Sequence, residues 1–227
     1  MTTPDNMRRI IPITEAEARL PFSELNGLLN EKCERIRLQS APWNENLPVL
    51  PMVNVRIAHS PSHIILKFDV AECEFRIAET EQPASVWEDS CVEFFVEPEK
   101  GGGYYNFEFN AAGVLHLAYG AGRHGREMAP DGIRQSVVRE VSMLATPNKE
   151  NPYVYNWTLI ARIPYAAFFR HHFEPRSGQV IRGNFYKCGD KLRHPCYLYW
   201  SPIDTPSPDF HQPSYFDNLE FAQHHPV

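Results

Sequence analysis

Alternation of apolar and polar residues at every second position is the feature that most constrains how this chain can fold. It recurs in short segments separated by Gly, Pro and Asn. A period of two places alternate side chains on opposite faces of an extended strand, whereas an amphipathic helix needs a period near 3.6. The pattern therefore predicts strands over most of the chain. The alternating segments are Val53–Ile57, Ile65–Phe68, Cys73–Ile77, Val92–Val96, Tyr105–Phe109 and Tyr155–Ile163.

Short strands joined by loop-length turn clusters indicate one all-β domain spanning residues 1–227. The natural architecture is an antiparallel β-sandwich of immunoglobulin or jelly-roll type, in which two packed sheets enclose the core. Helix is expected only in short pieces, one opening at the capping-box spacing of Thr14 and Glu17 and one near 165–169. Residues 1–30 are expected to form a peripheral extension, and the polar, Gly-rich segment 120–134 a long mobile loop.

Composition argues against several classes of partner and compartment. The formal net charge is −6 and there is no block of like charges, which disfavours nucleic acid because phosphate binding needs a basic surface. No apolar run approaches the ~20 residues that span a bilayer. The first 20 residues lack the apolar run of a secretory signal, which favours the cytoplasm; a secreted or periplasmic protein is the alternative if a leader was removed. The odd, irregularly spaced cysteines predict free buried thiols: Cys33, Cys73, Cys91, Cys188 and Cys196.

The stretch VWEDSCVEFFVEPEKGGGYYNFEFNAAG combines strand-forming residues with several carboxylates. If Val92, Phe94 and Val96 face the core, Glu93 points to the opposite face, and the next strand places Asn106, Glu108 and Asn110 on that same face. The Gly-rich connection predicts a hairpin, so these side chains would share one surface. Sugars suit such a surface, because their C–H faces stack on aromatic rings and their hydroxyls pair with carboxylates and amides. An ordinary solvated sheet face would show the same pattern.

Two long runs carry a resemblance to a known family. VWEDSCVEFFVEP…YYNFEFNAAG and IRGNFYKCGD…HPCYLYWSPI…PDFHQPSYFDNLEF, within about Val53–Phe221, resemble the family 9-like carbohydrate-binding modules in their stand-alone form. The resemblance implies a β-sandwich that binds a mono- or oligosaccharide without catalysis, commonly at chain ends, between a pair of aromatic rings. It also implies a role in carbohydrate catabolism and, often, structural calcium.

The resemblance assigns roles to individual residues. Trp87 and Glu93, at the spacing W-x5-E, resemble the family's first clamp aromatic and its hydroxyl-binding acid. The second clamp aromatic would lie in the C-terminal run, and calcium, by family analogy, would use loop acids. The candidates for the second aromatic are Trp200, Tyr215 and Phe216, and those for calcium are Asp69, Glu72, Asp89 and Asp190.

Two other functions remain open at this point. A glycoside hydrolase could use Glu93 with Glu97 or Glu108, since such enzymes need two carboxylates ~5 Å or ~6.5–9.5 Å apart. A protein-interaction module could use the same aromatic residues to bind a partner. The chain has no G-x-S-x-G or H-E-x-x-H motif, which disfavours serine hydrolase and zinc protease chemistry.

Overall fold

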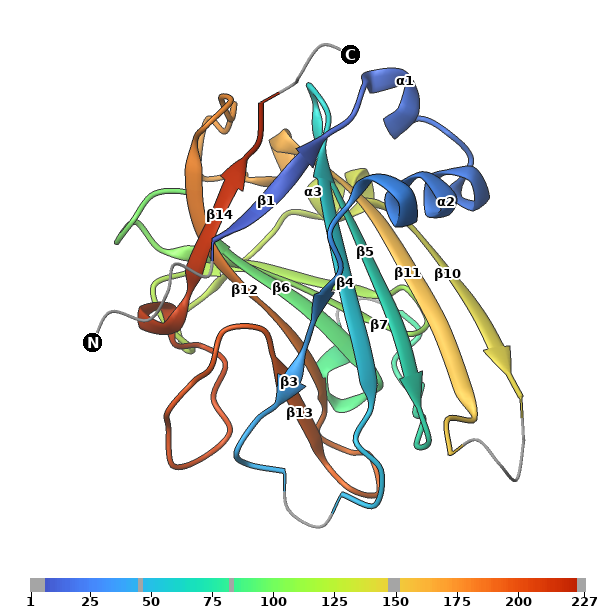
Figure 1. The fold of residues 1–227 in the computed structure, drawn as a ribbon. Helices are drawn as coiled ribbons and strands as arrows, with labels where there is room; N and C mark the ends of the chain where they lie inside the picture. Colours follow the sequence, from blue (N-terminus) through green and yellow to red (C-terminus); the bar gives the residue numbers. More distant parts are fainter. Residues whose placement is uncertain (1–6, 45–46, 82–83, 147–151, 224–227) are drawn as a thin grey trace.

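A computed structural model describes residues 7–44, 47–81, 84–146 and 152–223 of the chain. It confirms the all-β prediction: fourteen strands form the sheet structure, with few and mostly short helices (Figure 1). The strands are β1 (Arg8–Pro12), β2 (Ile36–Arg37), β3 (Gln39–Ser40), β4 (Met52–His59), β5 (His63–Glu72), β6 (Cys91–Glu97), β7 (Tyr104–Asn110), β8 (Leu115–Gly120), β9 (Glu127–Met128), β10 (Val138–Ala145), β11 (Tyr155–Pro164), β12 (Val180–Gly189), β13 (Cys196–Tyr199) and β14 (Asp217–Phe221). The helical segments are α1 (Glu15–Ala18), α2 (Phe22–Lys32), α3 (Asp131–Ser136) and the 3-10 turns η1 (Val86–Glu88), η2 (Tyr165–Ala167) and η3 (Pro213–Tyr215).

The strands follow one hydrogen-bonded path, in the order β10-β11-β5-β4-β1-β14-β12-β6-β7-β8-β9. Strand β1 joins the two halves of this path, because it pairs in parallel with β4 on one side and with β14 on the other (Figure 1). This corrects two expectations: the ladders are not all antiparallel, and the N-terminal segment is not simply peripheral, since Ile10 is fully buried. A strand of five residues has too few alternating positions to show a clear period.

The main core is formed by side chains from both halves of the strand path. The ring of Phe68 on β5 meets Phe185 on β12 edge-on, with centroids 6.3 Å apart, and Phe185 stacks on Phe94 of β6 at 5.0 Å. The inward positions predicted for the hairpin are confirmed. All of them are buried in this core: Val92, Phe94, Val96, Tyr105, Phe107 and Phe109.

Helix α2 was not predicted and explains an irregular pattern in the sequence. Its Leu25 and Leu29 pack against Ala58, Ile65 and Ile160, which lie on β4, β5 and β11. These strands are therefore buried on both faces, and a strand buried on both faces loses its polar alternation. This is why HIILKF reads less cleanly than the other strands. The predicted capping box at Thr14 is confirmed at α1, and the predicted short helix after β11 is confirmed as η2.

Two predicted segments differ from the structure. The strand expected over Cys73–Ile77 is wrong: β5 ends at Glu72, and the following segment leaves the ladder. There the Arg76 carbonyl accepts a hydrogen bond from the Ser90 backbone N–H, and the Arg76 N–H donates to the Ser90 hydroxyl. The segment 120–134, expected to be one long loop, contains β9 and the start of α3. In the described residues, no helix has the length and apolar character needed to cross a membrane.

Candidate binding site

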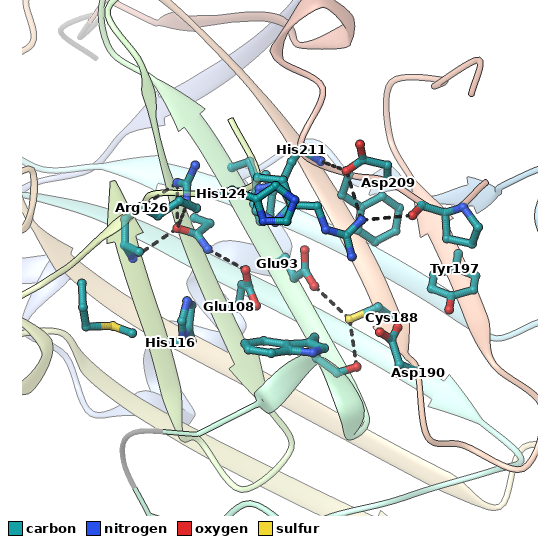
Figure 2. Close-up of a pocket in the computed structure, with 18 residues that line it drawn as sticks. Glu93, Glu108, His116, His124, Arg126, Cys188, Asp190, Tyr197, Asp209 and His211 are labelled. Atoms are coloured by element: carbon teal, nitrogen blue, oxygen red, sulfur yellow. Dashed lines mark hydrogen bonds and ion pairs between the residues drawn. The ribbon is translucent and has the colours of Figure 1, made fainter. Parts of the chain in front are cut away.

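A cavity of about 480 Å³ lies on the non-core face of the β6–β7 hairpin (Figure 2). Its floor comes from β6, β7 and β8, and η1 and the end of β12 supply one wall. The rest of the lining comes from the segment 123–128, from Tyr197 on β13 and from the loop 208–211. The hairpin face predicted from the sequence is therefore not a plain solvated surface, because elements distant in sequence enclose it.

Glu93 and Glu108 face each other across the β6–β7 ladder in the cavity floor. Glu93 Oε1 accepts a hydrogen bond from the Cys188 thiol at 2.8 Å, and Glu108 Oε1 accepts one from the Asn106 amide at 2.7 Å. Both side chains are almost fully buried, with residue exposures of 3% and 4%. Within the part of the chain that the structure describes, the second oxygen of each carboxyl receives no donor, so each can still bind a ligand hydroxyl.

Burial sets the protonation of this pair. It raises the pKa of Glu108 to about 7. Burial also raises the pKa of Glu93 well above its usual range, and the neighbouring charge of Glu108 raises it further. The pair therefore retains at least one proton near neutral pH, because two buried carboxylates this close resist double ionisation. A protonated carboxyl donates as well as accepts, which suits hydroxyl ligands.

Arg126 holds the floor in place from the segment that the sequence analysis treated as a loop. Its Nη2 donates to Asn106 Oδ1 at 2.8 Å and to the Tyr104 carbonyl at 2.9 Å, and its Nη1 donates to the Gly122 carbonyl at 2.8 Å. The guanidinium lies 4.2 Å from the centroid of the Tyr104 ring. Since Asn106 in turn donates to Glu108, a chain of contacts runs from Arg126 to the floor carboxyl. An arginine inside a polar, aperiodic segment gave no signal of this role.

Trp87 lines the cavity from η1 and is half-buried. Its ring meets His116 edge-on with centroids 5.3 Å apart. Its carbonyl accepts a hydrogen bond from the backbone N–H of Asp190 at 3.0 Å, which ties the turn to the end of β12. The Cys188 sulfur, whose single proton is donated to Glu93, lies 3.5 Å from the same carbonyl. Trp87 and Glu93, linked in the sequence by the spacing W-x5-E, therefore line the same cavity.

The other aromatic walls come from residues that the sequence analysis did not select. Tyr197 on β13 and Phe210 in the C-terminal loop both line the cavity, with ring centroids 6.1 Å apart. Phe210 is held by stacking on Tyr186 at 4.1 Å. Their position in the sequence could have indicated this role, since both residues lie in the C-terminal run that carries the family resemblance.

Two cavity histidines are neutral near pH 7. Burial lowers the pKa of His116 to about 4 and that of His211 to about 3. His211 Nδ1 lies 2.7 Å from the Tyr104 hydroxyl, which fixes its ring at the cavity wall. A neutral imidazole offers one donor and one acceptor nitrogen, again a match for hydroxyl ligands.

Four residues selected from the sequence lie outside this cavity. Trp200, the residue directly after β13, is in the main core, where its ring lies 5.5 Å from Phe185. Asn110 is buried beside Asp89 and donates to it at 3.0 Å. Phe216 packs edge-on against Tyr104 at 5.3 Å, and Tyr215 turns its hydroxyl to the Asp204 carbonyl at 2.9 Å. The structure therefore brings together Trp87, Glu93, Asn106 and Glu108 only.

The acids considered for calcium do not form a ligand set. Asp69 pairs with Arg56 and Lys67, Glu72 pairs with Lys187, and Asp89 pairs with Arg76. Carboxylates already neutralised by cations do not fit a Ca²⁺ site, which needs six to eight free oxygen ligands. Asp190 lines the binding cavity. We derive no function through calcium.

Fold and cavity together define a β-rich protein with a pocket of carboxyl, imidazole and aromatic groups, whose chemistry suits a small, hydroxyl-bearing ligand. The chain belongs to carbohydrate-binding family 9, whose sequence profile matches residues 24–221.

Comparison with solved structures agrees with this assignment. A candidate carbohydrate-binding protein from Bacteroides uniformis is 37% identical, covers 95% of this chain and 98% of its own, and has a TM-score of 0.81. A family 9 module from Caldicellulosiruptor kristjanssonii, solved with glucose, has a TM-score of 0.60 at 11% identity, covering 98% of this chain and 99% of its own. The same module with cellotriose gives 0.60 and 11%, covering 97% and 99%. At this identity, the module supports the fold alone. A search of curated proteins found no match.

Proposed function

We propose that the β6–β7 cavity is the site at which this member of the family binds a short saccharide, without cleaving it. One observation carries this proposal: Trp87 borders the same cavity as two buried carboxyls, Glu93 and Glu108, each with an oxygen free to bind. The volume of about 480 Å³ falls within the range of small-ligand sites. Glucose and cellotriose, the ligands of the Caldicellulosiruptor module, are the first candidates.

The division of labour follows from chemistry. Trp87 supplies the aromatic platform for the apolar face of a sugar ring, while the floor carboxyls exchange hydrogen bonds with its hydroxyls. Tyr197 or Phe210, rather than the residues selected from the sequence, provides the second ring. Asp190 and the neutral His116 add further donors and acceptors to the lining.

Binding without cleavage is supported by how the floor is built. Glu93 already accepts a hydrogen bond from the Cys188 thiol, and Glu108 already accepts one from Asn106. Both carboxyls thus take part in holding the pocket. We expect no release of nitrophenol from aryl glycosides; hydrolysis that disappears in Glu93→Gln would instead establish the hydrolase alternative.

Calorimetric titration tests the site directly. Trp87→Ala should weaken glucose or cellotriose binding by about 1–3 kcal/mol, the usual cost of truncating an aromatic anchor. Tyr215→Ala is the matched control, because Tyr215 is half-buried but lies outside the cavity; its affinity should be unchanged. Loss of affinity in Tyr215→Ala with none in Trp87→Ala would move the site elsewhere.

We also propose that the two halves of the strand path are the layers of a β-sandwich joined along one side by β1, and that the chain is a single domain. The aromatic contacts of Phe185 with both halves support this architecture. Limited proteolysis should leave one resistant fragment.

We further propose a cytoplasmic, reducing environment, supported by five unpaired thiols of which four are buried. Fractionation of the native host, followed by immunodetection, checks the compartment.

A further inference from the structure

Two thiols and a carboxyl converge at one end of the cavity floor. Cys91 and Cys188 are register partners in the β6–β12 ladder, and directly opposed residues point to the same face of a sheet. Glu93 follows Cys91 by two positions on β6, so its side chain points to that face too. The two sulfur atoms and a carboxylate oxygen all lie within 4.8 Å of one another.

We propose that Cys91, Glu93 and Cys188 form a binding site for Zn²⁺, in which the protein supplies three ligands and the fourth position faces the cavity. Zn²⁺ is bound by Cys sulfur at ~2.3 Å and by carboxylate oxygen at ~2.0–2.2 Å, usually with tetrahedral geometry. Two sulfurs bound to such an ion lie about 3.8 Å apart, so atoms within 4.8 Å need only small adjustments.

The surroundings favour a site rather than a chance cluster. All three side chains are nearly buried, with residue exposures of 0%, 3% and 2% for Cys91, Glu93 and Cys188. The cavity gives an ion access, because Glu93 and Cys188 both line it (Figure 2). Two thiolates with one carboxylate match Zn²⁺ better than Ca²⁺ or Mg²⁺, which prefer oxygen ligands alone.

The strands hold the three ligands without help from loops. Each thiol and the carboxyl sit on β6 or β12, whose ladder runs through the register pairs Cys91–Cys188 and Glu93–Tyr186. Ligands on regular strands keep their relative positions better than ligands on loops. The site does not depend on sugar binding, since none of its ligands needs a saccharide in place.

Cobalt substitution provides the test. Untagged protein in a phosphine reductant, titrated with Co²⁺, should develop the near-ultraviolet thiolate-to-cobalt charge-transfer band together with the intense visible bands of tetrahedral Co²⁺. Added Zn²⁺ should bleach these bands as it displaces the cobalt, and equilibrium dialysis should give one Zn²⁺ per chain. Absence of a thiolate band in the unsubstituted protein overturns the proposal.

A pair of double variants locates the ligands. The double variant Cys91→Ser with Cys188→Ser should abolish the thiolate-to-cobalt band. The control, Cys73→Ser with Cys196→Ser, also removes two thiols, but at a separate place in the fold, and should retain the band. The opposite outcome also overturns the proposal. If the first double variant does not fold, as judged by its thermal melt, Glu93→Gln gives an independent answer: Zn²⁺ affinity should fall about tenfold or more. An unchanged affinity there contradicts the assignment of Glu93 as a ligand. Every measurement in this test reports metal binding. A negative result would therefore contradict the Zn²⁺ site without contradicting the saccharide site, which is tested by calorimetric titration with sugars.

Discussion

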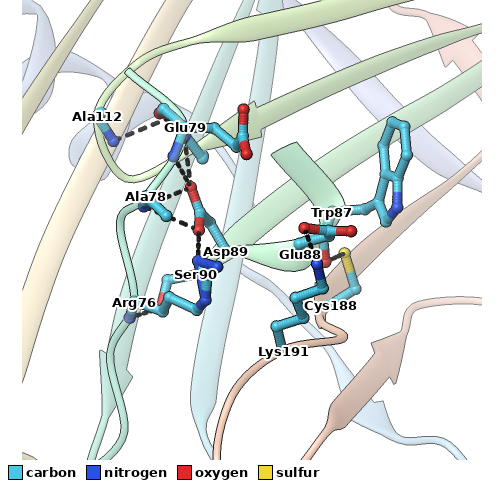
Figure 3. Close-up of polar contacts among 11 residues, drawn as sticks. Arg76, Ala78, Glu79, Trp87, Glu88, Asp89, Ser90, Ala112, Cys188 and Lys191 are labelled. Atoms are coloured by element: carbon cyan, nitrogen blue, oxygen red, sulfur yellow. Dashed lines mark hydrogen bonds and ion pairs between the residues drawn. The ribbon is translucent and has the colours of Figure 1, made fainter. Parts of the chain in front are cut away.

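Asp89, which follows the η1 turn, and the cavity acids Glu93 and Glu108 are all buried, but their surroundings are opposite (Figures 2 and 3). Asp89, fully buried, accepts hydrogen bonds from the Arg76 guanidinium at 2.7 Å, from the backbone N–H groups of Ala78 and Glu79, and from the Asn110 amide. Glu108, equally enclosed, receives one hydrogen bond from Asn106 in the part of the chain that the structure describes.

The comparison separates structural from functional acids. A buried carboxylate with a cation and several N–H donors is stable as an anion and has no capacity left for a ligand. A buried carboxyl with one donor instead has its pKa raised by desolvation and keeps an oxygen available. Asp89 therefore fixes the segment 76–79 to η1, whereas Glu93 and Glu108 are available to bind hydroxyls.

The largest expected effect is on stability and belongs to Asp89. Asp89→Ala leaves the Arg76 charge and several N–H groups without their partner, and breaking a buried ion pair typically costs about 3–5 kcal/mol. Because Arg76 is partly exposed, we expect the lower end, about 3 kcal/mol, in urea unfolding. A decrease of less than about 1 kcal/mol in the free energy of unfolding would show that Asp89 does not have the structural role that distinguishes it from Glu93 and Glu108.

The second prediction concerns Glu108 and pH. Its folded-state pKa of about 7 lies above the ordinary value of 4.5, so the folded state binds more protons between these values. Its contribution to stability is fully present below about pH 4.5 and is lost as the pH rises through about 7. The side chain in Glu108→Gln cannot ionise. As the pH rises through this window, the free energy of unfolding of the variant should therefore increase relative to that of the unsubstituted protein, by at most about 3 kcal/mol.

Urea unfolding of both proteins at several pH values measures this difference. Taking the difference is necessary because His116, whose folded pKa is lowered to about 4, makes the opposite contribution: it destabilises the fold as the pH falls below about 6.5. That contribution is common to both proteins and cancels. The difference also contains the relief of Glu93, because the charge of Glu108 is one cause of its raised pKa. A pH-independent difference would mean that Glu108 is not desolvated in the folded state.

The sequence determined the parts of this comparison that depend on strand periodicity. Alternation in CVEFFVE and YYNFEFN was enough to place Glu93, Asn106 and Glu108 on one face of a hairpin, as the structure confirms. It also placed Asn110 on that face, yet Asn110 lies at the strand end, where it turns toward Asp89 instead. Periodicity gives the face of a residue but not what covers it.

The remaining pocket residues could not be derived from local pattern. Arg126, Tyr197 and Phe210 come from three separate segments and meet only through tertiary contacts. Trp200 shows the converse problem: an aromatic residue in a family motif was selected as a ligand contact, although its side chain is buried in the core directly after β13. Strand β1 was not predicted from the sequence, because its pairing partners β4 and β14 are distant in sequence.

The third prediction sharpens the role of positioning within the pocket. Arg126→Ala removes the guanidinium that fixes Asn106 Oδ1, and Asn106 then no longer holds the Glu108 carboxyl in one orientation. A hydrogen bond to a charged group contributes about 1.5–3 kcal/mol, so saccharide affinity should fall roughly tenfold. Calorimetric titration measures it, and Arg170→Ala, which removes an exposed pair with Glu127, is the control. Equal affinity in both variants would exclude the relay.

The smallest expected effect comes from the acid next to Asp89. Glu88 pairs with Lys191 at 2.8 Å, but Glu88 is 22% and Lys191 58% exposed, so water and salt screen the pair. Glu88→Ala should therefore cost no more than about 1 kcal/mol in urea unfolding, against about 3 kcal/mol for Asp89→Ala one position along the same turn. Backbone hydrogen bonds from Asp190 to Trp87 and from Lys191 to Glu88 keep the turn attached to the end of β12 without the side chain. Saccharide affinity should consequently stay within twofold of the unsubstituted protein. A large loss of affinity in Glu88→Ala would show instead that the ion pair, rather than the backbone, positions Trp87.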